Sequence, residues 1–301
     1  MINLTLRQLR YFHALASYGH FGRAADACAV SQPALSMQIK EMEEVLGGPL
    51  LERNARQITL TRLGEELVRR VRDILRAVDE LGDIARAAQG PLTGVLRIGM
   101  IPTIAPYLLP KLIKRFTRAY PEIDLRVRET LTSKLIEELG EGRLDAAILA
   151  LPVSEPTLTE VPLFDETFLL VRPAADQHQP VPSKKMLRDM KLLLLEEGHC
   201  FREQALAFCN MRSPRQDSLD ANSLSTLVQM VGAGIGLTLI PEMAAAVETQ
   251  SAPVSAVRLK HPQPSRTIGM VWRKTSPLAG QLLELSKVVA QAGGKGRKVS
   301  F

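Results

Sequence analysis

The chain has 301 residues, enough for two domains of ordinary size, and its hydrophobic and charged fractions of 46% and 23% are typical of a globular protein. The formal net charge of +6 is compatible with nucleic-acid binding but does not establish it. The sequence contains neither an apolar run approaching about 18 residues nor the apolar core of an export signal, so we expect a cytoplasmic protein without a membrane span.

Residues 1–61 predict three helices followed by a hairpin. Thr5 is a good N-cap, apolar residues recur at helical spacing up to Gly19, and a short segment of small residues follows. Ser31 then caps a third helix, with Pro33 in its first turn, where a missing N–H costs nothing. The expected inward stripe of this helix is Leu35, Ile39, Met42 and Leu46.

Small and polar residues at the start of the third helix, after a tight turn, are typical of the recognition helix of a helix-turn-helix. Short side chains let the amides of a helix approach phosphates, and glutamine can read base edges. The candidate DNA contacts are Ser31, Gln32, Pro33, Ala34, Ser36 and Lys40. The alternative at this level is a plain three-helix bundle.

Residues 50–60 form two short alternating segments around a basic turn, which predicts a hairpin wing with Arg53 and Arg56 near a phosphate backbone. Thr61 then caps a long helix over residues 62–90. Its apolar seam is Leu67, Val71, Ile74, Val78, Leu81, Ala85 and Ala88. A seam of this length has no use inside a small domain, so we expect it to join two chains in a homodimer. The dimer would place two recognition helices on neighbouring half-sites.

Residues 91–301 alternate strands and helices. A β-α-β-α-β order over residues 95–149 predicts a parallel sheet, and further strand patterns begin a second unit before the chain returns to the first. Two crossings, near Leu163 and near Arg266, are what a hinged domain of two lobes requires. We expect lobe I at about 91–163 and 267–301, and lobe II at about 164–266.

Two of the three cysteines, Cys200 and Cys209, stand at the ends of one short amphipathic segment. In a helix their Cα atoms would lie roughly 13 Å apart, whereas a disulfide needs about 7 Å or less. Bridging them must therefore unwind or fold back the segment, which makes it a two-state element that thiol oxidation could bias. Disulfides in a reducing compartment are rare and transient, so a bridge here would be sensory. The alternative is two unrelated cysteines that fill apolar pockets.

Residues 1–90 resemble the winged helix-turn-helix and linker helix of LysR-type transcriptional regulators, and the resemblance continues over the whole chain. The residues that carry it are Leu9 to Phe12, Ala24-Ala25, Ser31 to Ser36, Ile39, Leu46-Gly47, Leu51 to Arg53 and Leu60 to Gly64. It implies an all-α winged helix-turn-helix domain followed by an α/β effector domain of two lobes, similar to periplasmic binding proteins. It also implies double-stranded DNA and RNA polymerase as partners, and assembly into homotetramers.

Within this family the match is to hydrogen-peroxide sensors. It is carried by Gly99 to Pro110, Gly198 to Ala205, Phe208-Cys209, Asn222 to Leu224 and Arg266 to Gly269. By this resemblance, Cys200 is the peroxidatic thiol and Cys209 the resolving thiol, and the bridge between them alters DNA binding and transcription of antioxidant genes. The resemblance also implies that Thr103, Thr132 and His199 line the peroxide pocket. A reductant of glutaredoxin or thioredoxin type would restore the thiols.

The residues around Cys200 agree with this chemistry. A thiol reacts as its thiolate, and three groups would favour that form: the N-terminus of the helix, His199 and Arg266. Peroxide attack would give a sulfenic acid, which a second thiol converts to a disulfide. Thr103 and Thr132 could hold the peroxide by hydrogen bonds.

Each residue assignment has an alternative. Either threonine could be only a helix N-cap, Thr130 competes with Thr132, and His199 could merely pack beside its strand. Cys28 lies among alanines, and we interpret it as a buried small apolar residue.

Three other functions stay open at this level. A LysR-type regulator of another kind would bind a small organic inducer in the cleft between the lobes, and would carry one cysteine or none in these contexts. A thiol peroxidase would use Cys200 catalytically, but would leave the first ninety residues without a purpose. A solute-binding protein would need an export signal. We expect a regulator and no enzyme, no cofactor and no metal site, since the five His and three Cys do not cluster at ligand spacing.

Overall fold

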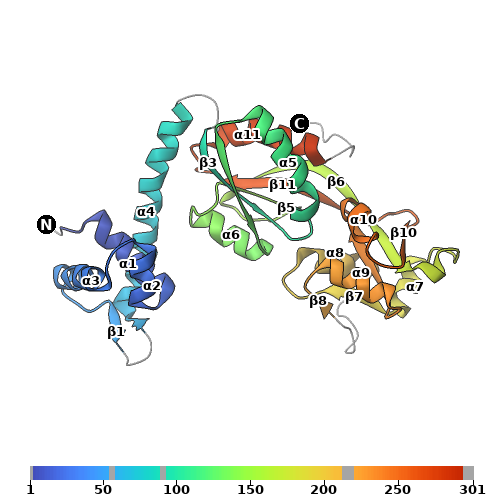
Figure 1. Ribbon diagram of the computed structural model, residues 1–301, viewed down its shortest axis with the longest axis horizontal. Coiled ribbons are helices and arrows are strands. Elements are labelled where there is room, and N and C mark those ends of the chain that lie inside the picture. Colours follow the sequence, from blue (N-terminus) through green and yellow to red (C-terminus); the bar gives the residue numbers. More distant parts are fainter. Residues whose placement is uncertain (1–2, 54–57, 89–92, 212–219, 294–301) are drawn as a thin grey trace. The chain divides into compact units, whose positions relative to one another are not determined.

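The computed structural model describes residues 3–53, 58–88, 93–211 and 220–293 (Figure 1). By its internal contacts the chain divides into two units, Met1–Ala85 and Arg86–Phe301. Among the described residues, no helix is both long and apolar enough to cross a membrane.

Three helices around one apolar core begin the first unit, as the sequence predicts. They are α1 (Leu6–Tyr18), α2 (Phe21–Ala27) and α3 (Gln32–Leu46). A capping box at Thr5 begins α1, and Oγ of Ser31 accepts the amide of Ala34 at 3.4 Å to begin α3. The buried core includes Phe12, Leu15, Leu35, Ile39 and Met42, while Leu46 is half-buried.

A hairpin and a long helix follow. They are β1 (Leu51–Arg53), β2 (Ile58–Leu60) and α4 (Arg62–Ala88). The strands pair antiparallel, with Leu51 opposite Leu60. Thr61 lies between the hairpin and α4, where its hydroxyl accepts the amide of Gly64 at 3.0 Å and donates to the carbonyl of Pro49 at 2.8 Å. A Cβ on Gly64 would lie 2.2 Å from the carbonyl oxygen of Leu50, so no side chain fits at this contact.

The structure divides the predicted seam of α4 into two parts. Leu67 and Val71 pack against the core of their own unit, and Val71 is only 2% exposed. Ile74 and Leu81 are 46% and 65% exposed, and Ile84, which the prediction omitted, is 54% exposed. The expectation that the whole seam faces a second chain is therefore wrong for its first part, because α4 begins as a core helix of the first unit.

A mixed sheet runs through the second unit, and its described strands follow the order β4-β3-β5-β11-β6-β9-β7-β8, with β10 paired to β6. The strands are β3 (Gly94–Met100), β4 (Ile123–Glu129), β5 (Ala146–Leu151), β6 (Leu158–Pro173), β7 (Leu192–Leu195), β8 (Asp220–Ala221), β9 (Leu237–Pro241), β10 (Val254–Arg258) and β11 (Ser265–Arg273). The predicted parallel pairing holds for β3 with β4 and β5, while β11 is antiparallel to both β5 and β6.

The helices of the second unit lie between or after these strands in the sequence. They are α5 (Ala105–Ala119), α6 (Thr132–Gly140), η1 (Ala174–Asp176), α7 (Lys184–Asp189), α8 (Cys200–Cys209), α9 (Leu224–Gly232), α10 (Glu242–Glu248) and α11 (Ala279–Gly293). The sequence does not predict α7, α10 or β10, which are too short or too weakly patterned to be recognised.

Two apolar cores lie along this sheet, and the long strand β6 connects them. One core gathers around β3, β5 and β11, and the other around β7 and β9. Strand β6 contributes to both cores, and β11 pairs along it. These strands contain Leu163 and Arg266, near which we expect the chain to cross between lobes. The boundaries that we expect at residues 90, 163 and 266 stay predictions.

Candidate functional site

Helix α8 spans Cys200–Cys209 as predicted, and its first turn is fixed to the sheet. Arg202 is 4% exposed. Its Nη1 donates to the carbonyl oxygen of Leu195 at 2.5 Å and pairs with Asp220 at 2.9 Å. Because Leu195 is the last residue of β7, these bonds hold the N-terminus of α8, and with it Cys200, at the carboxyl end of that strand.

Cys200 is a free, half-buried thiol between two hollows. The first hollow is lined by Ile101, Pro102, Thr103, Leu131, Thr132, Gly198, His199, Cys200 and Phe201. It therefore brings together Thr103, Thr132 and His199, the three residues predicted to surround Cys200. The space among them is narrow, and Cys200 and Thr132 also face a second, open hollow.

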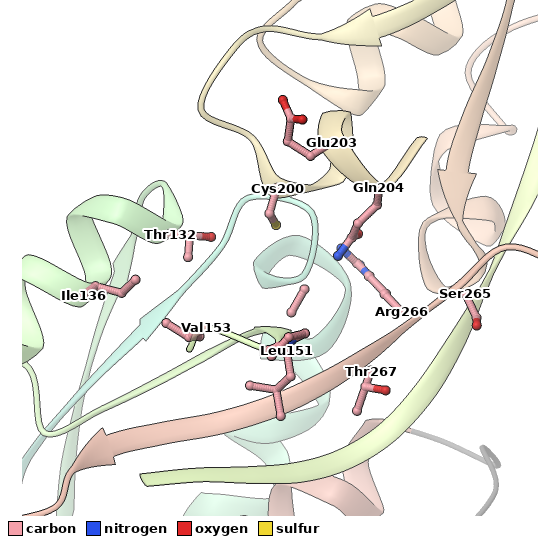
Figure 2. Close-up of a pocket in the computed structure, with 12 residues that line it drawn as sticks. Thr132, Ile136, Leu151, Val153, Cys200, Glu203, Gln204, Ser265, Arg266 and Thr267 are labelled. Atoms are coloured by element: carbon pink, nitrogen blue, oxygen red, sulfur yellow. The ribbon is translucent and has the colours of Figure 1, made fainter. Parts of the chain in front are cut away.

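The second hollow is an open cleft of about 550 Å³ (Figure 2). It is lined by Thr132, Ile136, Ala150, Leu151, Pro152, Val153, Cys200, Glu203, Gln204, Ser265, Arg266 and Thr267. Figure 2 shows the Thr132 hydroxyl directed toward Cys200 and the Glu203 carboxylate directed away from it. Oγ1 of Thr132 and Oε1 of Gln204 are buried without a hydrogen-bond partner. Two such oxygens near a thiol offer a place to a small hydrogen-bonding molecule.

Arg266 reaches this cleft from β11, and its side chain is fully buried. Its Nη1 donates to Oγ1 of Thr103 at 2.8 Å, and its Nη2 donates to the carbonyl oxygen of Thr103 at 3.1 Å. Glu166 of β6 stands opposite Arg266 in the strand register and accepts from Nε at 2.8 Å. The same carboxylate oxygen lies 2.7 Å from Nη2. Glu166 therefore neutralises the guanidinium, so Arg266 is not a free positive charge beside Cys200.

Neither Glu166 nor Gln204 is among the predicted site residues, although Gln204 lies within the segment Gly198 to Ala205 that carries the resemblance. Gln204 follows Cys200 by four residues, so one turn of the helix places both side chains on the same face. That spacing is a signal that could have identified it. Glu166 reaches the site only through the pairing of β6 with β11, which the sequence does not specify.

His199 is 9% exposed at the N-cap position of α8, where its side chain makes no capping hydrogen bond. Burial lowers the pKa of the imidazole below its ordinary 6.5, although the charge of Glu196 acts in the opposite direction. The imidazole is therefore neutral at pH 7, which limits its action on Cys200 to hydrogen bonding.

Cys209 lies at the other end of α8, fully buried in the second apolar core. Burial raises the pKa of its thiol, and the charges of Lys184 and Arg188 oppose this only in part. Nε of Arg188 donates to the carbonyl oxygen of Cys209 at 2.8 Å and so caps the helix. Nζ of Lys184 lies 5.0 Å from the ring centroid of Phe208. Cys209, like Cys200, is a free thiol.

Two alternatives from the sequence can be compared with the geometry. Thr132 lines both hollows beside Cys200, whereas Thr130 lines neither. Cys28 is half-buried rather than fully buried, because it ends α2 at the margin of the first unit's core. Burial raises the pKa of this thiol. Within the described part of the chain, no group of three or more His, Cys, Asp and Glu side chains could hold a metal ion.

The residues predicted to contact DNA fall on α3 and the hairpin. Gln32, Pro33 and Lys40 are exposed, and Ala34 and Ser36 are half-buried. Met37, which the prediction did not include among these contacts, is 57% exposed and follows Ser36 on the same helix. Arg53 is the last residue of β1, and Arg56 lies outside the described residues.

Comparisons with known proteins cover both units. Residues 6–65 match the family described as "Bacterial regulatory helix-turn-helix protein, lysR family", and residues 89–293 match the "LysR substrate binding domain". A "Probable hydrogen peroxide-inducible genes activator" from Streptomyces viridosporus is 42% identical over 294 residues, which cover 96% of this chain and 94% of that protein.

Solved structures extend the likeness to the fold. A full-length OxyR variant from Pseudomonas aeruginosa has a TM-score of 0.74 and 36% identity, with 96% of this chain and 94% of that chain covered. A hydrogen-peroxide-bound OxyR variant from Corynebacterium glutamicum has a TM-score of 0.66 and 33% identity, with 97% and 93% covered. With both family regions matched and relatives that align over almost its whole length, the chain belongs to the LysR family of bacterial regulatory helix-turn-helix proteins.

Proposed function

We propose that this LysR-family regulator senses hydrogen peroxide through Cys200 and converts the signal into a change of DNA binding. The observation that carries the proposal is the setting of Cys200. It is a free, half-buried thiol at an open cleft, beside the unpartnered hydroxyl of Thr132 and the neutral imidazole of His199. The names of the relatives, a peroxide-inducible gene activator and a peroxide-bound OxyR, support the same stimulus.

The first step oxidises Cys200. Its thiolate attacks one oxygen of hydrogen peroxide, so that an S–O bond forms while the O–O bond breaks. Sulfur loses two electrons, and the leaving hydroxide takes up the proton that the thiol released, which gives a sulfenic acid and water. Thr103 and Thr132 hold the peroxide by hydrogen bonds, and His199 supports the attacking sulfur with a further one.

The second step joins Cys200 to Cys209. The thiol of Cys209 attacks the sulfenic sulfur, the S–S bond forms, and a second water leaves. Nine residues of intact helix separate the two Cα atoms by roughly 13 Å, and a disulfide needs about 7 Å or less. Helix α8 must therefore unwind. Full exposure of Phe201 or Leu206, both now buried, would cost about 1.5–3 kcal/mol each, so reversible oxidation requires the disulfide to offset that cost.

The signal passes from this switch to DNA through assembly. The exposed part of α4, with Ile74, Leu81 and Ile84, joins two chains, and a homotetramer sets the spacing of their α3 helices. A reductant of glutaredoxin or thioredoxin type returns the disulfide to two thiols, and RNA polymerase reads the changed DNA complex in the cytoplasm.

Mass spectrometry of the purified full chain, before and after one equivalent of peroxide, tests the proposal. We expect a linked peptide of Cys200 and Cys209 that dithiothreitol removes. Cys200→Ser should lose the link and the peroxide-dependent change in DNA footprint while still binding DNA. Cys209→Ser should form a sulfenic acid at Cys200, which dimedone traps, without a link.

Cys28→Ser is the matched control, because it removes the thiol that lies outside the switch. It should respond to peroxide as the parent chain does. A Cys200→Ser footprint that still changes with peroxide would contradict the proposed function.

The size of the cleft supports a second candidate, regulation by a small organic inducer. A volume of about 550 Å³ is more than peroxide needs and lies within the range of small-molecule sites. Footprinting of Cys200→Ser with a cell extract free of peroxide tests this candidate. A reproducible change would support an inducer, and an unchanged footprint would leave the thiol as the sensor.

A further inference from the structure

Arg266 lines the open cleft beside Cys200 and forms a buried pair with Glu166. The two residues are direct partners in the register of β6 and β11, although 100 positions separate them in the sequence. Their side chains are 5% and 0% exposed. A buried ion pair contributes little net stability, because both charges lose their hydration. Stability alone therefore does not account for two charges at this position.

Each nitrogen of the Arg266 guanidinium has a partner. Nε and Nη2 contact Oε2 of Glu166 at 2.8 and 2.7 Å, while Nη1 and Nη2 donate to Thr103. The other oxygen of Glu166, Oε1, accepts the amide of Met243 at 2.9 Å. Glu166 is thus fixed from α10, and it fixes the plane of the guanidinium in turn.

This arrangement decides what the Thr103 hydroxyl can do. A guanidinium only donates, so Oγ1 of Thr103 must act as the acceptor in its 2.8 Å bond to Nη1. The hydroxyl hydrogen cannot point at Arg266 and is available to another acceptor. Thr103 lines the same hollow as Cys200, so the hydrogen can be donated beside the reacting thiol.

We propose that Glu166 is a positioning residue for the oxidation of Cys200. It anchors Arg266, which makes Thr103 an acceptor on one side and so leaves its one hydroxyl hydrogen for the leaving oxygen of peroxide. The inference rests on the proposed function, in which Cys200 reacts with peroxide. Loss of a fixed donor at a site of developing charge lowers a rate by about 100- to 1,000-fold. Loosening the same donor should cost less, and we expect about tenfold.

The test compares two reagents on the full chain in a Cys209→Ser background, where only the first step occurs. Hydrogen peroxide is followed by dimedone trapping and mass spectrometry. Iodoacetamide serves as the second reagent, because it also needs the thiolate but its iodide leaving group needs no hydrogen-bond donor. Glu166→Gln should slow peroxide oxidation about tenfold and change alkylation by less than about twofold. Equal slowing with both reagents would indicate a merely structural role and overturn the proposal.

Asp165→Asn is the matched control, since it makes the same chemical change one residue earlier on β6, where the side chain is exposed. Both of its rates should equal those of the parent. If Glu166→Gln does not fold, Glu166→Asp replaces it, because the shorter carboxylate cannot reach Arg266 and the Met243 amide together. The same selective loss is expected of it, and a peroxide rate equal to the parent's would overturn the proposal.

A double variant tests whether Glu166 acts through Thr103. Thr103→Val keeps the shape of the side chain and removes the donor, so it should slow peroxide oxidation at least as much as Glu166→Gln. Adding Glu166→Gln to it should cause no further loss, whereas losses that multiply would refute the coupling. A parent Cys200 that reacts with peroxide no faster than free cysteine would instead refute the proposed function, which distinguishes the two failures.

Discussion

The two ends of α8 place the same functional group in opposite surroundings. Cys200 is half-buried beside polar groups at an open cleft. Cys209 is fully buried in an apolar core, where burial raises the pKa of its thiol. Both cysteines are free thiols, but Cys200 should be reactive and Cys209 should not.

The arginines that hold the two ends of α8 also differ in burial and in their number of described bonds. At the first turn, Arg202 is buried and bonded both to Leu195 and to Asp220. At the last turn, Arg188 is exposed and its described bond to the helix is the single one to the carbonyl of Cys209. Water and salt weaken an exposed cationic cap more than a buried one. The helix should therefore open from its C-terminus, so that Cys209 moves toward a stationary Cys200.

The sharpest test of this contrast is the alkylation of each thiol in the reduced native chain. Iodoacetamide should modify Cys200 roughly a thousandfold faster than Cys209, the ratio expected when Cys209 needs a local opening of about 4 kcal/mol. Peptide mapping after timed quenching measures both rates. In 8 M urea the two rates should agree within a few fold. Equal rates in the native chain would mean that the two ends do not differ in accessibility.

Leu206→Ala should break the contrast by loosening the C-terminal end. Leu206 is 6% exposed in the core that holds Cys209, so its truncation should lower the free energy of unfolding by about 2–5 kcal/mol. Disulfide formation should become faster, while sulfenic acid formation at Cys200 keeps its rate. Urea unfolding and timed non-reducing gels measure these effects. Ala207→Gln, an exposed change on the same helix, should alter neither. A slower disulfide in Leu206→Ala would mean that the helix opens elsewhere.

The two ends should also respond to opposite changes of pH. Because the pKa of His199 is lower in the folded chain, the unfolded chain binds a proton at His199 at a higher pH than the folded chain does. The contribution of His199 to the free energy of unfolding is therefore fully present above about pH 6.5 and is lost as the pH falls. The folded pKa of Cys209 is raised, so its part is present below about pH 8.5 and lost as pH rises. Urea unfolding at a series of pH values should show that the free energy of unfolding falls less at acid pH in His199→Gln than in the parent. An equal fall in both would show that His199 is not its source.

The smallest expected effect is that of the C-terminal cap. Arg188→Ala removes the cation and hydrogen-bond donor that α7 presents to the last turn of α8. Such a contact contributes about 0.3–1 kcal/mol at an exposed helix end. Disulfide formation should then become about two- to fivefold faster at low salt, and the difference should shrink at high salt. Lys185→Ala, a neighbouring exposed cation on α7, is the control. A slower reaction in Arg188→Ala would mean that the cap assists the opening rather than resisting it.

Local signals made much of the redox site predictable. The bounds of α8 follow from its amphipathic pattern, and Thr103, Thr132 and His199 meet Cys200 as the resemblance implies. The choice of Thr132 over Thr130 was also available from the sequence.

Other features depend on pairings that no local pattern encodes. Glu166 meets Arg266 because two strands 100 positions apart share a register, and a shift by one residue would turn the carboxylate to the other face. The α4 seam divides into a buried and an exposed part because the core of the first unit covers Val71. A heptad pattern records that a stripe is apolar, and it does not record which surface covers each position.

The close contact at Gly64 has a mechanical consequence for a regulator that must turn a distant event into motion on DNA. The Gly64 backbone packs against the Leu50 carbonyl, and the Thr61 hydroxyl donates to the carbonyl of Pro49. The base of the hairpin and the first turn of α4 should therefore move as one rigid unit. A rotation of α4 about its own axis should then rotate the hairpin by the same angle. Any side chain at position 64 would separate α4 from the Leu50 carbonyl. Selection for DNA binding should therefore recover only glycine at this position, and not even alanine.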